Sequence, residues 1–424
     1  MKRALIITYY WPPAGGSGVQ RWLKFAKYFH NFDIEPIIYT IKNPAYPLID
    51  KSLLNEIPNG IEILKQPIWE PNNLFSFRKK HQKQSAGFLN SKPSFFGGIL
   101  QYIRANYFIP DARKFWINPS VNYLKNYLKN NPVDVVISTG PPHSTHLIGL
   151  KLKEELQLKW IADFRDPWTD IDYFHHLPLT KKSLKKHLFL EEEVVKNADV
   201  IMVVGETMKQ NYLKFNKNIK IVTNGFDGEI ADEKVNLDSK FSITHIGLMN
   251  ADRNPILLWK VLKEIGTENS QFLKDLNINL VGKIDKDILG SISENSLNKK
   301  VTIIDYLPHN KIDNFQNKSQ FLLLVVNNVP SAKGIITGKI FEYLKAKRPI
   351  LAIAPKNGDL ATIIYETESG IVVDFQDKEL LKSTILAWYS LYKNENLKIK
   401  SKNIGQYHRK ELTGKVATII KAIT

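Results

Sequence analysis

The feature that most constrains the fold is the alternation of short apolar runs with longer amphipathic segments along nearly the whole chain. Short apolar runs are typical of buried strands, and helical spacing of apolar residues between them is typical of helices. In the first half the runs lie at residues 3–8, 34–40, 61–64, 133–139, 159–163, 199–204 and 219–223. In the second half they lie at 242–247, 278–282, 301–305, 321–326, 349–354 and 371–373. The alternation predicts an α/β fold with doubly wound parallel sheets.

The chain divides into two such series. Its 424 residues are too many for one ordinary core. Residues 224–240, NGFDGEIADEKVNLDSK, are polar, contain glycine and have no apolar period, which is typical of a linker. We expect α/β domains at 1–225 and 241–405, a linker at 226–240 and a C-terminal helix at 406–424. A ligand site is then expected in the cleft between the domains, at the carboxyl ends of both sheets.

A basic and aromatic insertion is expected at about 70–120. The formal net charge is +17, and between residues 77 and 131 the single acid is Asp111. Basic residues such as Arg104 and Lys114 alternate there with apolar ones such as Ile99, Tyr107 and Phe115. This mixture favours contact with an anionic membrane surface. An insertion with inward-packed aromatics, and a site for single-stranded nucleic acid, are the alternatives.

The remaining composition bounds the cellular setting. The chain has no cysteine, which excludes disulfides, cysteine-based zinc sites and thiol catalysis. It has no apolar run of about 18 residues, so no membrane-spanning helix is expected. The N-terminal MKRALIITYYWPP reads as a buried strand followed by a turn rather than a signal peptide. We expect a cytoplasmic protein that is peripheral at the inner face of the cytoplasmic membrane.

The stretch KGIITGKIFEYLKAKRPILAIAP at 333–355 predicts a loop, a short helix and a buried strand. Thr337, Gly338 and Lys339 fall at the junction of loop and helix, where backbone N–H groups and the helix dipole favour a phosphate. Glu342, one turn on, offers a carboxylate to a ribose diol. The pattern indicates a nucleotide or a nucleotide-sugar. An ordinary amphipathic helix with a buried apolar face is the alternative.

Other residues of the second half lie at the ends of predicted strands. Gly247 follows the first of these strands, and Arg253 stands near the next helix start, where it is a candidate for neutralising a leaving diphosphate. Lys283 follows the second strand, and Tyr306 follows the third and is a candidate surface for a base. Their common position at strand ends carries the argument.

In the first half, Gly15, Gly16 and Gly18 precede a helix and leave room for a substrate phosphate or sugar at the backbone. Gly16 and Gly18 fit the first two positions of the dinucleotide fingerprint, but Arg21 stands at the third. No carboxylate follows the second strand, so a hydride-transfer enzyme is not expected. A glycine turn that serves only strand-to-helix geometry is the alternative.

Two further segments follow strands of the first half. In ADFRDPW at 162–168, Arg165 is a candidate for binding an anionic acceptor and Asp166 for a base or a sugar-hydroxyl acceptor. A structural ion pair is the alternative. In GPPHSTH at 140–146, His143 begins a helix and is a candidate hydrogen-bond donor to a sugar or phosphate. A capping histidine is the alternative, and a metal site is not expected.

Together these segments resemble the GT-B glycosyltransferases, and within them family 4. YYWPPAGGSGVQR resembles the N-terminal glycine loop of the family, DFRDPW a segment of bacterial surface-polysaccharide members, and TNGFD the end of the first domain. GKIFEYLKAKRPILA resembles the donor-binding motif, with the ribose glutamate at Glu342. Family members often carry another glutamate eight residues earlier, and here that position is Gly334. Backbone groups around 334–337 are then expected to contact the donor.

The resemblance implies a retaining, metal-independent transferase with no cofactor. The second domain would bind a nucleoside-diphosphate-sugar, with Arg253 and Lys339 stabilising the departing diphosphate. The first would hold the acceptor, with Asp166 as the base if there is one, and the basic and aromatic insertion suggests that the acceptor is a lipid-linked saccharide or a lipopolysaccharide. Hinge closure would bring donor and acceptor together. A non-hydrolysing nucleotide-sugar epimerase of the same fold and a nucleic-acid-binding protein are the alternative functions.

Overall fold

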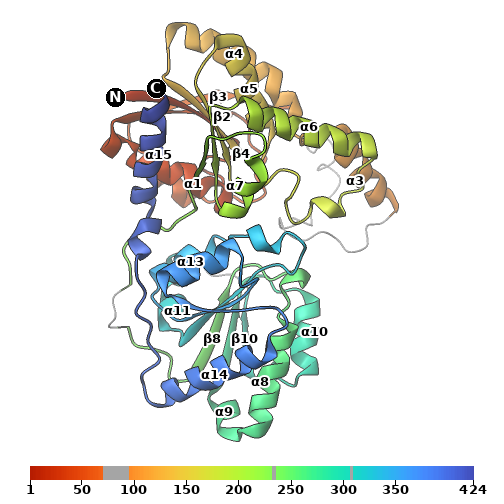
Figure 1. Ribbon diagram of the computed structural model, residues 1–424, viewed down its shortest axis with the longest axis vertical. Coiled ribbons are helices and arrows are strands. Elements are labelled where there is room, and N and C mark those ends of the chain that lie inside the picture. Colours follow the sequence, from red (N-terminus) through yellow and green to blue (C-terminus); the bar gives the residue numbers. More distant parts are fainter. Residues whose placement is uncertain (70–94, 232–234, 306–308) are drawn as a thin grey trace. The chain divides into compact units, whose positions relative to one another are not determined.

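The computed structural model describes residues 1–69, 95–231, 235–305 and 309–424. The chain forms two compact units (Figure 1). The N-terminal unit comprises Met1–Asp227 and Arg409–Thr424, and the C-terminal unit comprises Gly228–His408. Tyr306 and the basic residues of the expected insertion at 70–94 lie outside the described residues.

The N-terminal unit is built on a parallel sheet of seven strands in the order β3-β2-β1-β4-β5-β6-β7. The strands are β1 (Lys2–Ile7), β2 (Ile34–Ile41), β3 (Glu62–Gln66), β4 (Val135–Gly140), β5 (Trp160–Phe164), β6 (Val200–Val203) and β7 (Ile219–Ile221). Ile6 of β1 is in register with Ile38 on one side and with Ile137 on the other. The strand order therefore reverses between β1 and β4, where open sheets of this kind bind ligands.

Helices cover both faces of this sheet (Figure 1). They are α1 (Ser17–Tyr28), α3 (Phe95–Tyr107), α4 (Ile117–Asn130), α5 (Ser144–Leu156), α6 (Lys181–Asn197), α7 (Glu206–Tyr212) and α15 (Arg409–Ile423). Ile6 packs in the cluster that contains Trp22 of α1 and Val416 of α15. Ile7 packs in the cluster that contains Leu124 of α4. Successive side chains of β1 thus enter opposite cores, which explains why its run is apolar throughout.

A buried ion pair joins α1 to the end of β5. The guanidinium of Arg21 contacts both carboxylate oxygens of Asp163, at 2.8 and 3.1 Å, and both side chains are fully buried. Trp22 Nε1 (2.8 Å) and Thr139 Oγ1 (2.9 Å) also donate to Asp163. Arg21 occupies the third position of the dinucleotide fingerprint because it has this structural partner inside the unit.

The C-terminal unit has a parallel sheet of six strands in the order β10-β9-β8-β11-β12-β13. The strands are β8 (Phe241–Ile246), β9 (Leu276–Val281), β10 (Val301–Ile304), β11 (Phe321–Val325), β12 (Ile350–Ile353) and β13 (Gly370–Val373). The helices are α8 (Ile256–Glu268), α9 (Ser270–Asp275), α10 (Lys286–Glu294), α11 (His309–Lys318), α12 (Lys339–Lys345), α13 (Asp359–Thr367) and α14 (Lys378–Lys393). Here the order reverses between β8 and β11.

The predicted α/β fold with doubly wound parallel sheets is confirmed, and each predicted apolar run overlaps a strand of the structure. The last helix begins at Arg409, because Ile404–Tyr407 form a 3₁₀ turn before it. Its buried residues Leu412, Val416 and Ile420 recur every fourth position and join the core of the N-terminal unit. The two ends of the chain meet there, where Lys2 Nζ donates to the carbonyl of Thr424 at 3.2 Å.

Candidate functional site

Lys339, the first residue of α12, reaches back to the end of β8. Its ammonium nitrogen lies 3.2 Å from the carbonyl oxygen of Leu248 and 3.2 Å from Nε2 of His245. His245 is fully buried, and its Nδ1 lies 3.0 Å from the carbonyl oxygen of Leu323. A carbonyl only accepts, so Nδ1 carries the ring proton and Nε2 accepts from Lys339. Burial, reinforced by the charge of Lys339, lowers the pKa of His245 well below its ordinary value and keeps it neutral.

Arg253 approaches the same carbonyl from the loop after β8. Its Nη1 donates to the Leu248 oxygen at 3.2 Å, and its Nε donates to Oδ1 of Asn327 at 2.5 Å. Burial lowers the pKa of Lys339, and the positive charge of Arg253 lowers it further. Two cations that share one carbonyl repel each other, and an anion bound between them would remove that repulsion. The pair is therefore suited to bind a diphosphate.

Two glycines allow the backbone after β8 to lie close to the side chain of Lys339 and to the backbone after β9. Gly247 has φ +106°, and a Cβ there would lie 2.6 Å from Cε of Lys339. Gly282, at the end of β9, has φ +117°, and a Cβ there would lie 2.8 Å from the carbonyl oxygen of Gly247. L-residues rarely adopt such φ values. The end of β8 is thus a crowded backbone surface on which the aliphatic part of Lys339 lies.

The start of α12 is open by comparison. Gly338 has φ −57°, and a Cβ there would meet no atom within 4 Å. Thr337 and Gly334 are half-buried in the preceding loop. The helix α12 has only seven residues, so Arg253 and Lys339 are the charged groups on which an anion site here would depend. Glu342 is half-buried, with one carboxylate oxygen 3.7 Å from the ammonium of Lys345.

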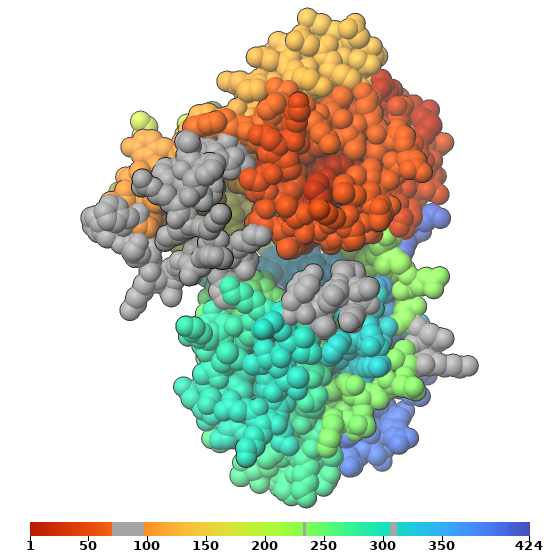
Figure 2. Space-filling view, turned by 180° about the vertical axis from the view of Figure 1, so that it is seen from behind, coloured from red at the N-terminus to blue at the C-terminus, as the bar shows by residue number. Residues whose placement is uncertain are grey.

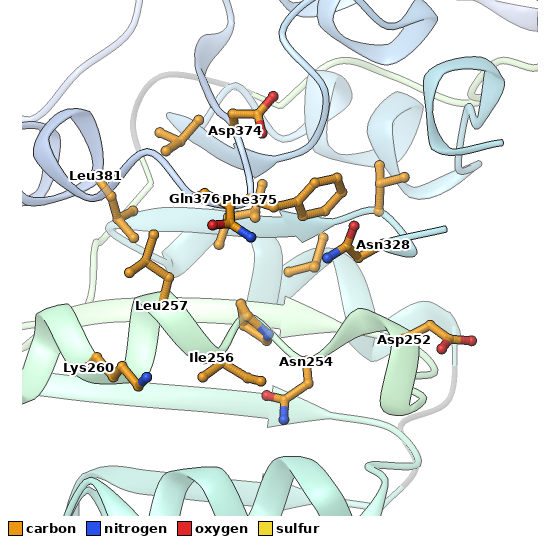
Figure 3. A pocket seen from close by; sticks show the side chains of 15 residues that line it. Asp252, Asn254, Ile256, Leu257, Lys260, Asn328, Asp374, Phe375, Gln376 and Leu381 are labelled. Atoms are coloured by element: carbon orange, nitrogen blue, oxygen red, sulfur yellow. The ribbon is translucent and has the colours of Figure 1, made fainter. Parts of the chain in front are cut away.

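Lys283 is exposed at the end of β9, and Tyr306 lies outside the described residues. A pocket of about 310 Å³ lies in the same unit, beside the start of α8 (Figure 3). Asp252 and Asn254, the neighbours of Arg253, line it together with Asn328, whose backbone N–H donates to the carbonyl of Asp252 at 2.8 Å. The pocket has the size of a small-ligand site, and its lining includes the sequence neighbours of Arg253 but neither Arg253 nor Lys339.

In the N-terminal unit, each glycine of the first loop has a structural reason. A Cβ at Gly15 would lie 2.8 Å from Cγ of Leu48, and a Cβ at Gly18 would lie 3.1 Å from the ring of Tyr10. Gly16 precedes α1 with φ +85° and is exposed. Their contact with an acceptor remains a prediction.

Arg165 binds the backbone around this loop. Its guanidinium donates to the carbonyls of Gly18 (2.5 Å), Gly140 (3.1 Å) and Pro141, which uses three of its five N–H donors. It therefore braces the glycine loop against the turn after β4. Asp166 follows it as an exposed side chain, and its role as a base or a sugar-hydroxyl acceptor remains a prediction.

His143 lies just before α5 without capping it. Asp111 makes the cap instead, because its carboxylate accepts from both the backbone N–H (2.9 Å) and the hydroxyl (2.8 Å) of Ser144. The His143 ring is buried and stacks on Trp168, with centroids 4.5 Å apart and planes 5° apart. Burial, followed by the nearby His146, lowers the pKa of His143, so its ring is neutral.

Sequence reasoning missed the residues that hold Trp168. They lie on α6: Nδ1 of His187 accepts from the Trp168 indole at 3.0 Å, and Glu191 accepts from its backbone N–H at 3.2 Å. Glu191 also accepts from the hydroxyl of Tyr212 at 2.6 Å. The one available signal was His187 and Glu191 themselves, which are spaced as one face of a helix in an otherwise lysine-rich segment.

No protein-family model matches the chain, and no curated protein matches it. Solved structures match across its whole length. WaaG, a glycosyltransferase involved in lipopolysaccharide biosynthesis, is 12% identical with a TM-score of 0.55, covering 99% of each chain. HepE from Anabaena, in complex with UDP-glucose, is 11% identical with a TM-score of 0.57, covering 100% of this chain and 97% of that one. A putative UDP-N-acetylglucosamine 2-epimerase from Listeria monocytogenes is 12% identical with a TM-score of 0.55, covering 100% and 96%. The chain has the GT-B fold of two Rossmann-like units.

Proposed function

We propose that this protein is a glycosyltransferase that moves a sugar from a nucleoside-diphosphate-sugar to an acceptor. The observation that carries the proposal is the approach of Arg253 and Lys339 to the carbonyl of Leu248, beside Gly247. Cleavage of the donor leaves charge on the diphosphate, and fixed cations stabilise the charge that develops in the transition state more than they stabilise the bound donor. The GT-B fold, which a solved UDP-glucose complex also has, is compatible with this role.

For the residue roles, the stereochemistry and the acceptor of this reaction, we propose what the sequence analysis leads us to expect. The donor diphosphate would lie against Arg253 and Lys339, and its ribose against Glu342. Asp166, exposed after β5, would accept a proton from the acceptor hydroxyl if a dedicated base is used. Transfer would retain configuration and need no metal, and the acceptor would be a lipid-linked saccharide or a lipopolysaccharide. WaaG, which has a similar fold, is involved in lipopolysaccharide biosynthesis, and this supports an acceptor of the lipopolysaccharide class.

A thermal-shift screen against UDP, GDP, ADP and their sugars tests the donor. A ligand at about 100 times its Kd stabilises the native state by about 2.7 kcal/mol. We expect one nucleotide and its sugar to raise the midpoint, and Lys339→Met to reduce that shift at the same ligand concentration. If none of these nucleotides moves the midpoint, the proposed donor class is wrong.

Product analysis separates the transferase from an epimerase of the same fold. A transferase releases nucleoside diphosphate in step with glycosylation of an added acceptor, whereas an epimerase converts the donor sugar without any acceptor. The buried His245, engaged by Leu323 and Lys339, is poorly placed for the proton transfers of epimerisation. Retention of activity in excess EDTA checks the metal-independence. A loss that added Mg²⁺ restores would exclude it.

A further inference from the structure

The N-terminal unit exposes a large apolar surface around α3 and α6. Ten large apolar side chains there keep between 40% and 65% of their surface exposed: Trp69, Ile99, Leu100, Tyr102, Ile103, Tyr107, Phe115, Leu184, Leu188 and Phe189. Single exposed apolar residues are ordinary, but a group of this size marks an interaction site. Figures 1 and 2 both show α3 at the side of the unit. These ten residues and six neighbouring cations form what we call the α3–α6 surface. The cations are Arg104, Lys114, Lys181, Lys182, Lys185 and Lys186.

Contacts that the structure provides make this surface continuous. Asn106 of α3 donates to the carbonyl of Pro178 at 2.8 Å and accepts from the backbone N–H of Thr180 at 2.8 Å, just before α6. The ammonium of Lys114 lies over the ring of Phe115, 4.9 Å from its centroid. The Phe115 ring in turn meets that of Trp69, with centroids 4.8 Å apart. The apolar groups of α3, the segment after it and α6 therefore form one surface.

The exposed face of α6 is not the face by which this helix packs against the core. The helix is docked by its other face, through the buried residues Ser183, His187 and Glu191. Leu184 and Leu188, four residues apart, lie on the exposed face together with Phe189. An external partner must cover this face if it is to leave water.

The charges of the surface identify that partner. Among the residues that the structure describes, no ion-pair partner of its six cations is found. Burial, and then the charge of Lys186, lower the pKa of Lys114, so the cations of α6 lie close enough to act on Lys114. Basic side chains beside exposed aromatic and aliphatic ones match the headgroup layer of an anionic bilayer.

We propose that the α3–α6 surface docks the N-terminal unit on an anionic lipid membrane, with α3 and the first half of α6 in the interface. None of the helices in the described ranges combines the length and hydropathy needed to cross a bilayer. The lysines of α6 attract the anionic headgroups, and the leucines and aromatics enter the boundary with the acyl chains. Docking needs neither donor nor acceptor, so it is testable apart from the proposed transferase activity.

Vesicle flotation tests the proposal with the full chain. Wild-type protein is mixed with phosphatidylcholine vesicles, with or without phosphatidylglycerol, at low and high salt. The charge variant replaces the four exposed lysines of α6: Lys181→Gln, Lys182→Gln, Lys185→Gln and Lys186→Gln. The apolar variant combines Leu184→Ser, Leu188→Ser and Phe189→Ser. The control removes four exposed lysines of the C-terminal unit: Lys263→Gln, Lys274→Gln, Lys286→Gln and Lys299→Gln.

We expect wild type and control to float with anionic vesicles only, and the charge variant to lose at least about tenfold in partitioning. The apolar variant should leave the vesicles when salt screens the remaining attraction. Unchanged flotation of both α6 variants, or an equal loss in the control, would overturn the proposal. So would a wild-type dimer without lipid that the apolar variant dissociates, because a second copy would then cover the surface. Circular dichroism and thermal midpoints confirm that the variants are folded.

Discussion

Arg253 and Lys339 donate to one acceptor, the carbonyl oxygen of Leu248, each at 3.2 Å. The two residues are far apart in the sequence, and the end of β8 brings them together. Their repulsion is present before any ligand binds, so an anion that enters between them gains more than it would from either cation separately. This relationship makes the contribution of Lys339 measurable in several ways.

Replacing Lys339 by methionine should weaken nucleotide binding. A hydrogen bond to a charged group contributes about 1.5–3 kcal/mol, so the Kd of the nucleoside diphosphate should rise roughly 10- to 100-fold. The midpoint of the ligand-free protein should not fall, because the variant removes a repulsion. Isothermal titration gives the Kd, with the exposed Lys286→Met as the matched control. Equal affinity in both variants would show that the phosphates bind elsewhere.

The lowered pKa of Lys339 predicts a pH dependence of binding. A bound diphosphate raises this pKa again, so binding takes up a proton wherever the pH lies between the two values. Affinity is then highest below the lowered pKa and falls as the pH rises through it. The guanidinium of Lys339→Arg stays protonated, so its affinity should be nearly independent of pH. A nucleotide-sugar is the appropriate ligand, because its phosphates do not titrate in this range. Identical pH profiles for wild type and Lys339→Arg would contradict the assignment.

Substitution of Gly338 should affect donor binding without lowering the stability of the ligand-free protein. Its φ of −57° suits alanine, and a Cβ there would meet no atom within 4 Å. Gly338→Ala should therefore leave the ligand-free protein unchanged or more stable by about 0.4–1 kcal/mol. The same methyl group should obstruct a phosphate at the start of α12 and raise the KM for the donor. Gly247→Ala is the contrasting variant, because its φ of +106° and the contact with Lys339 should cost stability as well. An unchanged KM in Gly338→Ala would show that the donor does not bind against this loop.

Glu342 is expected to bind the ribose. Glu342→Gln should weaken binding of the ribonucleotide but change little for its 2′-deoxy counterpart, because the lost hydrogen bond involves the diol. Comparing four Kd values, two proteins with two nucleotides, isolates that interaction from any general effect on the site. The ion pair with Lys345 is long, at 3.7 Å, so thermal stability should hardly change. Equal losses of affinity for both nucleotides would show that Glu342 does not bind the ribose diol.

The Arg21–Asp163 pair should be essential for the stability of the N-terminal unit. Removing one member of a buried pair leaves the other charge without compensation, at about 3–5 kcal/mol. Asp163→Asn and Arg21→Leu should each lower the free energy of unfolding by that order in urea titrations. The double variant should cost less than the sum of the two single variants. The exposed Lys196→Gln is the control, and it should not change stability measurably. Additive losses would show that the two side chains act independently.

The candidate site was only partly readable from the sequence. Lys339, Gly338 and Glu342 stood out because they lie within one short motif, and Arg253 because it follows a strand. No sequence pattern indicates Leu248 or His245 as their partners, since a backbone carbonyl and a buried histidine have no pattern of their own. Arg165 was a candidate for binding an anion, yet three of its donors bind backbone carbonyls of two distant turns. Such partners depend on where turns meet in space.

The sequence by itself determined the strands, the helices and their alternation, because apolar period is a local property that burial imposes on each segment. That was enough to establish two doubly wound parallel sheets. Only the tertiary structure decided that Arg21 is the buried partner of Asp163, that Asp111 caps α5, and that Lys339 and Arg253 share one carbonyl. Each of these contacts joins residues distant in the chain, and no local pattern records which distant groups packing will bring together.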